Sequence, residues 1–151
     1  DTQLLGYCSL VVVKFADESD LTTVVIDVCE SGARKATESG EEVHCLPELY
    51  RMWAKALDDT DQASKALDIV RMAEAAATRQ AYYMPALWNR IHRTKSRILR
   101  KLSDEKGAAE CLSMIKLNGL TYCGVENSDD VADDRLRWMD RKPPGVRPVV
   151  Y

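Results

Sequence analysis

The chain has 151 residues, of which 46% are hydrophobic and 30% charged, with a formal net charge of -3 and a mean hydropathy of -0.31. This balance excludes a disordered or membrane-embedded chain and predicts one soluble globular domain. The longest apolar run, Leu10–Val13, is far shorter than the roughly 20 residues that cross a bilayer, and no signal-peptide pattern follows Asp1. Because the chain does not begin with Met, we expect a processed product, an excised domain or a piece with missing flanks.

The first element in chain order, residues 4–15, is ambiguous because Leu10–Val13 has strand propensity. We predict a helix, since apolar residues fall on one helical face and a lone strand would have no ladder partner in a helical chain. The residues of that face are Leu4, Cys8, Val12 and Phe15.

Apolar residues recur at helical spacing from Asp20 to Asn118. The pattern predicts a helix over 20–37, with Asp20 as N-cap and Ser39-Gly40 as the stop. Pro47 suits the first turn of the next helix, which extends to Leu57 and has Glu48 at the positive end of its dipole.

The acidic segment 58–61 interrupts the pattern and offers caps for an alanine-rich helix over 62–78. Pro85 begins a further helix, 85–102, and Ser103-Asp104 caps the last one, which Asn118-Gly119 ends. The apolar stripe of the helix 85–102 is Leu87, Ile91, Ile98 and Leu102, and that of the last helix is Ala108, Cys111, Leu112 and Ile115.

The cysteines and histidines form no recognisable site. Five cysteines at irregular spacing give neither a disulfide framework nor a C-x-x-C pair, which favours a reducing, cytoplasmic location. Adjacent His44 and Cys45 lack the spacing of zinc ligands, so we expect no metal. Because no catalytic or phosphate-binding motif occurs, we expect neither an enzyme nor a cofactor. We interpret Cys8, Cys29 and Cys111 as small hydrophobic residues.

Small residues at fixed spacing mark the helices 47–57 and 62–78. Ala54 is followed twelve residues later by Ala66 and then seven later by Ala73. The larger residues that accompany them are Tyr50, Trp53, Leu57 and Val70. This spacing resembles a tetratricopeptide repeat, which implies antiparallel helix pairs that touch through small residues. The next pair matches in part, because His92 and Lys95 stand where apolar residues are expected.

The segment from Pro47-Glu48-Leu49-Tyr50-Arg51 to Ala86-Leu87 also resembles the C-terminal repeats of large bacterial signalling ATPases, cyclases and transcriptional regulators. In those repeats a Glu-Leu-x-Arg helix is followed by an alanine-rich partner. The resemblance covers about a third of the chain and implies a scaffold or sensor module without catalytic residues.

The densest charged feature is a basic row on the helix 85–102, with no acidic residue from Arg90 to Leu102. The row consists of Arg90, Arg93, Arg97, Arg100 and Lys101. It is either a solvated face neutralised by neighbouring acids or a site for an acidic partner, a peptide carboxylate or a phosphate backbone. Because nucleic acid generally requires a more basic domain, a protein partner is favoured.

Two aromatic features are further candidates for binding. Tyr82 and Tyr83 either pack on the alanine-rich helix or form an exposed anchor. The segment 120–151 is acidic, then basic, then proline-rich, which predicts an irregular tail in which Trp138 helps to cap the last repeat. Alternatively, this tail binds a second chain, or its acidic part folds over the basic row.

We therefore predict an all-α fold, a right-handed stack of about three antiparallel helix pairs over 1–119 with an irregular tail over 120–151. The predicted function is a non-catalytic protein-interaction or scaffold module that binds another protein, through an acidic or aromatic-accepting surface, with no cofactor and no membrane. The alternatives are a regulatory domain excised from a larger signalling protein and a nucleic-acid binder that uses the helix 90–101.

Overall fold

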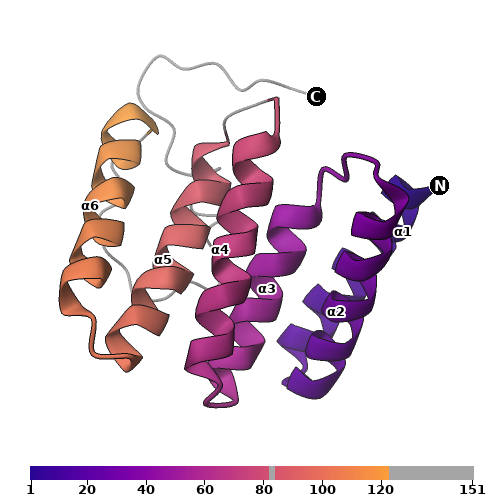
Figure 1. Cartoon of the computed structure of the whole chain (residues 1–151), viewed down its shortest axis with the longest axis horizontal. Helices are drawn as coiled ribbons and strands as arrows, with labels where there is room; N and C mark the ends of the chain where they lie inside the picture. The colour runs from indigo at the N-terminus through magenta and orange to yellow at the C-terminus, as the bar shows by residue number, and fades with distance from the viewer. Residues whose placement is uncertain (82–83, 123–151) are drawn as a thin grey trace.

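The computed structural model of the chain describes residues 1–81 and 84–122, with side chains as far as Ile115. Within this part of the chain every regular element is a helix, which confirms the predicted all-α class, including the helix at the ambiguous first segment (Figure 1). The six helices are α1 (Thr2–Glu18), α2 (Thr22–Ser39), α3 (Leu46–Asp59), α4 (Ala63–Arg79), α5 (Pro85–Lys101) and α6 (Glu105–Tyr122).

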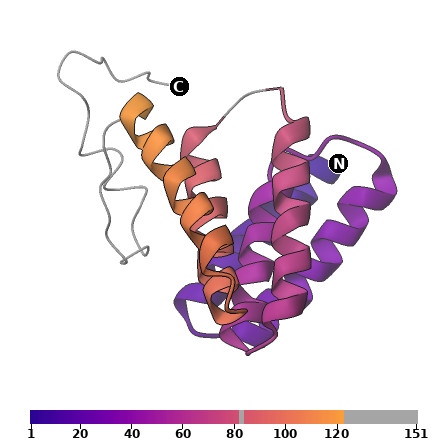
Figure 2. The ribbon, with the colours of Figure 1, turned by 60° about the vertical axis from the view of Figure 1, so that its left-hand side comes forward.

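The helices lie side by side in chain order, and consecutive helices run antiparallel (Figure 1). Each helix packs on the next one, and α3 also contacts α1 and α5, so that α1, α3 and α5 form one layer. The pair α1 and α2 is at one end of the array, and the pair α5 and α6 is at the other (Figure 2). Among the helices of the described residues, none lies against the outer side of α1.

Most of the predicted start and stop signals are confirmed. Pro47 and Pro85 lie in the first turns of α3 and α5, where a missing amide donor costs nothing. Gly40 ends α2 with a φ of 65°, a left-handed conformation that glycine adopts without strain. The carboxylate of Asp104 accepts a hydrogen bond from the amide of Gly107 at 2.9 Å, as expected of a cap for α6.

Three boundary predictions are wrong. Asp20 is not the N-cap of α2, because it takes a φ of 57° in the tight turn and Leu21 occupies the cap position. The segment 58–61 does not act as predicted, because Asp58 continues α3 and is fully buried, and the cap position of α4 is Gln62. Gly119 does not end α6, which continues to Tyr122, since a glycine inside a helix costs only about 1 kcal/mol.

The main core, to which the adjacent helices α3 and α4 both contribute, contains the alanines identified by their spacing. Ala54, Ala66 and Ala73 are each 0% exposed, so no solvent separates the two helices at these positions. Tyr50 and Trp53 are buried on the same helix, with ring centroids 6.4 Å apart. The small side chains allow close approach of the backbones, while the aromatic rings fill the space beside them.

Enlarging Ala66 to leucine will lower the free energy of unfolding by about 1–3 kcal/mol, because the added atoms have no space between α3 and α4. Urea denaturation measures the loss. The matched control is Ala75→Leu on the exposed side of α4, which should change stability by less than about 0.5 kcal/mol. Equal stability of both variants would contradict the tight contact.

A smaller hydrophobic cluster lies apart from the main core, at the end formed by α5 and α6. It consists of Leu99, Ala108 and Cys111, and the half-buried Leu67 of α4 packs against it. Leu102 was predicted to extend the apolar stripe of α5, but it is 37% exposed, because it follows the last residue of the helix. Leu67 also packs against the main core, so among the described side chains it connects the two clusters.

Candidate functional site

Helix α1 turns its small residues toward the rest of the protein. Its buried positions are Gly6, Ser9, Val13 and Ala16. At Gly6 a Cβ atom would lie only 2.7 Å from Sγ of Cys45 and 2.9 Å from a methyl carbon of Val43. At Gly32 of α2 a Cβ atom would lie 3.0 Å from Oγ of Ser9. Helix α1 thus packs closely through these short residues, and most of its large side chains lie on the opposite face.

The variant Gly6→Ala tests this close contact. An alanine normally stabilises a helix relative to glycine, by up to about 1 kcal/mol. Here we expect a loss of about 1–3 kcal/mol, because Cys45 and Val43 are buried and cannot move aside. Thermal or urea unfolding shows whether the variant is more or less stable than the wild type. Adding Cys45→Ala should recover part of the loss, since it removes the nearer atom; a stabilised Gly6→Ala would refute the contact.

The outward side of α1 carries a continuous apolar surface, here called the α1 apolar face. Its exposed fractions are 62% for Leu4, 39% for Leu5, 49% for Tyr7, 68% for Val11, 46% for Val12 and 69% for Phe15. Leu21 and Val24 extend it over the turn to α2, and Cys8, also exposed, lies within it. Large apolar side chains gathered on one exposed face are typical of an interaction site.

The sequence identified this face but did not indicate its orientation. Leu4, Cys8, Val12 and Phe15 do share one side of a helix, yet that side is solvent-exposed. Cys8 is therefore not a buried small hydrophobe, whereas Cys29 and Cys111 are buried as expected. The signal for the true packing side was the set of small residues at Gly6, Ser9, Val13 and Ala16, which the larger apolar residues obscured.

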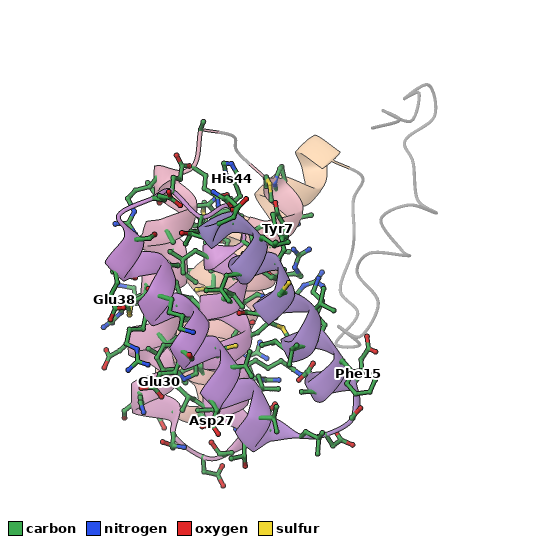
Figure 3. All side chains as sticks on the ribbon, turned by 90° about the vertical axis from the view of Figure 1, so that its right-hand side faces the viewer. Tyr7, Phe15, Asp27, Glu30, Glu38 and His44 are labelled. Atoms are coloured by element: carbon green, nitrogen blue, oxygen red, sulfur yellow. The ribbon has the colours of Figure 1, made fainter. Side chains whose placement is uncertain are left out.

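Acidic side chains lie beside the α1 apolar face. Figure 3 looks onto this end of the array, with Tyr7 and Phe15 toward opposite ends of α1 and Asp27, Glu30 and Glu38 along α2. All three acidic residues of α2 are exposed. The end surface thus combines an apolar helix with a partly acidic one.

The basic row on α5 is largely engaged within the protein. Nε of Arg97 lies 2.6 Å from Oδ2 of Asp58, and a terminal nitrogen of Arg97 donates to Oδ1 of Asp59 at 3.2 Å. Nζ of Lys101 lies 3.1 Å from Oδ1 of Asp58 and donates to its backbone carbonyl at 2.8 Å. These contacts fix the last turns of α5 on the last turn of α3, with a carboxylate that is 0% exposed at their centre.

A second ion cluster joins the first turns of the same two helices. Glu48 binds Arg51 through two hydrogen bonds, of 2.9 and 3.0 Å, and Nε of Arg90 lies 3.5 Å from it. Burial alone would raise the pKa of Glu48, but the charge and hydrogen bonds of Arg51 and the charges of Arg90 and Lys14 lower the pKa to about 2. Glu48 therefore stays ionised in the interior, where its role is to hold α5 on α3.

Of the remaining predicted binding residues, one is half-buried, one is exposed and three lie outside the described part of the chain. Arg93 is half-buried, with contacts inside the protein, and Arg100 is exposed. Lys95, on the adjoining side of α5, pairs with Glu74 of α4 at 2.8 Å. Tyr82, Tyr83 and Trp138 lie outside the described residues.

One polar residue of α5 that departs from the tetratricopeptide-like sequence pattern is buried. His92, which stands where an apolar residue was expected, is 9% exposed and lies against Trp88 with ring centroids 5.5 Å apart. Burial lowers its pKa, because the charged form would lose its hydration. His92 is thus a neutral residue packed on an aromatic ring.

A hollow of about 350 Å³ lies between the C-terminal ends of α2 and α4. Its lining includes Thr37, Glu41, Val43, Arg79 and Gln80. Across the described residues, no three histidine, cysteine or acidic side chains come together to hold a metal ion.

None of the helices in the described part of the chain has the length and apolar character needed to cross a membrane. Comparison with protein-family models, with curated proteins and with solved structures finds no match for this chain.

Proposed function

We propose that this chain is a non-catalytic protein-interaction module built from tetratricopeptide-like helix pairs, and that its docking surface is the α1 apolar face. The observation that carries the proposal is the exposure of Leu4, Val11 and Phe15, each more than 60% accessible, on one side of a single helix. A helix that is apolar on both its inner and outer sides is ordinarily covered on both.

The helix-pair interpretation is supported by the buried alanines between α3 and α4 and by the antiparallel order of the six helices. In such an array each pair covers the apolar side of the previous one, which leaves the side of a terminal helix for a partner. The partner's surface must be apolar at its centre. Basic residues at its edge would be favoured by Asp27, Glu30 and Glu38 of α2.

In this proposal the basic row pairs with α3 and is not the binding surface. Arg90, Arg97 and Lys101 all form ion pairs with α3, so their charges are already compensated inside the protein. A phosphate backbone or an acidic peptide would have to displace Glu48 or Asp58 to engage them fully. The α1 apolar face needs no such rearrangement, which is why we prefer it as the binding surface.

Site-specific photo-crosslinking in the native source tests this function. A photoreactive residue at position 11, in the centre of the α1 apolar face, should form covalent adducts with polypeptide. The matched control is position 72, a methionine of α4 that is 44% exposed, where we expect no adduct. No adduct at position 11, or equal adducts at both positions, would refute the proposed docking surface.

A further inference from the structure

The α1 apolar face is large enough to support a stable interface between two proteins. Its side chains, with Leu21 and Val24, expose roughly 700 Å², which exceeds the largest patch of about 300–600 Å² on a typical monomer. Two such faces in contact would bury roughly 1,400 Å², within the 1,200–2,000 Å² of specific complexes. The area therefore matches a pairing of this face with another of the same size.

The order of residues along the face is symmetrical about the middle of the helix. Six members of the face, all except Leu5, follow one another from Leu4 to Phe15 at spacings of 3, 1, 3, 1 and 3 residues, which are the same from either end. Leu5 lies outside this pattern, because its symmetrical position is Lys14. When two copies of α1 cross antiparallel, Leu4 faces Phe15, and Cys8 faces Val11. Tyr7 and Val12 face each other in the same way. A two-fold interface requires such self-complementarity.

Charge also favours a second copy at this position. Residues 2–13 contain no Asp, Glu, Lys or Arg. In a two-fold dimer through α1, no charged side chain of this stretch would therefore face a like charge in the second copy. A two-fold axis through the neighbouring face of α2 would instead bring a charged surface, with exposed Asp27, Glu30, Arg34 and Glu38, against its own copy. The uncharged stretch 2–13 of α1 is the part of this surface that can pair with itself.

From these observations we infer that the α1 apolar face binds a second copy of the chain, as an antiparallel two-fold dimer. The inference rests on the proposed function and specifies its partner. In this dimer the large side chains of α1 lie between two copies of the array. The acidic side of α2 remains at the edge of the interface, in contact with water.

Analytical ultracentrifugation of the chain tests the dimer. We expect twice the monomer mass of 17.0 kDa at micromolar concentrations. Val11→Glu, at a position 68% exposed in the single chain, should raise the dissociation constant at least 100-fold without changing the circular dichroism. The matched control, Met72→Glu on α4, should leave the dimer intact. A wild-type chain that remains monomeric, or a dimer that survives Val11→Glu, overturns the inference.

A cross-link through Cys8 tests the antiparallel arrangement. Helices in contact have axes about 8–10 Å apart, and the two copies of Cys8 would be offset by three residues, about 4.5 Å along the axis. In a Cys123→Ser background, a short bis-maleimide should therefore link the two chains, since Cys8 is exposed while Cys29, Cys45 and Cys111 are buried. With Cys8→Ser and Ser113→Cys on α6, no link should form. Links at position 113 but not at Cys8 would contradict the interface.

The two experiments separate the inference from the proposed function. If photo-crosslinks at position 11 join the chain to a different polypeptide and the wild type is monomeric, the face is a docking site and the dimer is wrong. If position 11 yields no adduct of any kind, both fail.

Discussion

Replacing Arg97 and Lys101 together by methionine will lower the free energy of unfolding by about 3–5 kcal/mol, the range for a buried charge that loses its partner. Asp58 is 0% exposed, and these two cations are the groups that face its carboxylate oxygens at 2.6 and 3.1 Å. Methionine keeps most of the aliphatic length of both side chains, so the loss reports the charges rather than packing. Urea denaturation at neutral pH measures it.

Adding Asp58→Asn to the double variant provides the control. The triple variant no longer buries a charge, so it should regain most of the lost stability. Arg100→Met, at an exposed position of the same helix, should be close to neutral. A double variant as stable as the wild type would show that Asp58 does not depend on these two cations.

Glu48 will make the protein less stable as the pH falls from about 4.5 to about 2. Despite the opposing effect of burial, the charge and hydrogen bonds of Arg51 and the charges of Arg90 and Lys14 lower the pKa of this carboxyl from 4.5 to about 2. Because the folded value is the lower one, the stabilisation is complete above the unfolded value and is lost as the pH drops toward the folded value. The difference corresponds to about 3 kcal/mol.

Unfolding of the wild type and of Glu48→Gln, measured over this pH range, isolates the contribution. We expect the stability advantage of the wild type to shrink by about 3 kcal/mol between pH 5 and pH 2, since the glutamine variant has no carboxyl to protonate. Equal pH dependence of the two proteins would show that Glu48 is not stabilised as an ion.

The helices and the alanine contacts could be predicted from sequence because both depend on local patterns. Pro47 and Gly40 act through their own backbone angles, and Ala54, Ala66 and Ala73 act through spacing within two adjacent helices. Such features need no knowledge of distant segments.

The partners of the basic row could not be predicted, because they are far away in the chain. Arg97 binds Asp59 across 38 positions, and Arg90 binds Glu48, which local rules assigned only to the helix dipole. A helix without acidic neighbours in sequence thus acquires them from another helix in space. The orientation of α1 was missed for a related reason. Hydrophobicity ranks Leu4 and Phe15 above Gly6 and Ser9, whereas close helix contact prefers the smaller residues.

The small cluster of Leu99, Ala108 and Cys111 meets the main core at Leu67, so we expect α6 to form a weaker cooperative unit than the helices around the main core. Helix α6 packs chiefly on α5, so it can open without exposing the interior around Leu49 and Leu57. Amide protons over residues 105–115 should therefore exchange with deuterium before those over 46–59. We expect local opening to start at α6, while the α1 apolar face, at the opposite end, keeps its shape.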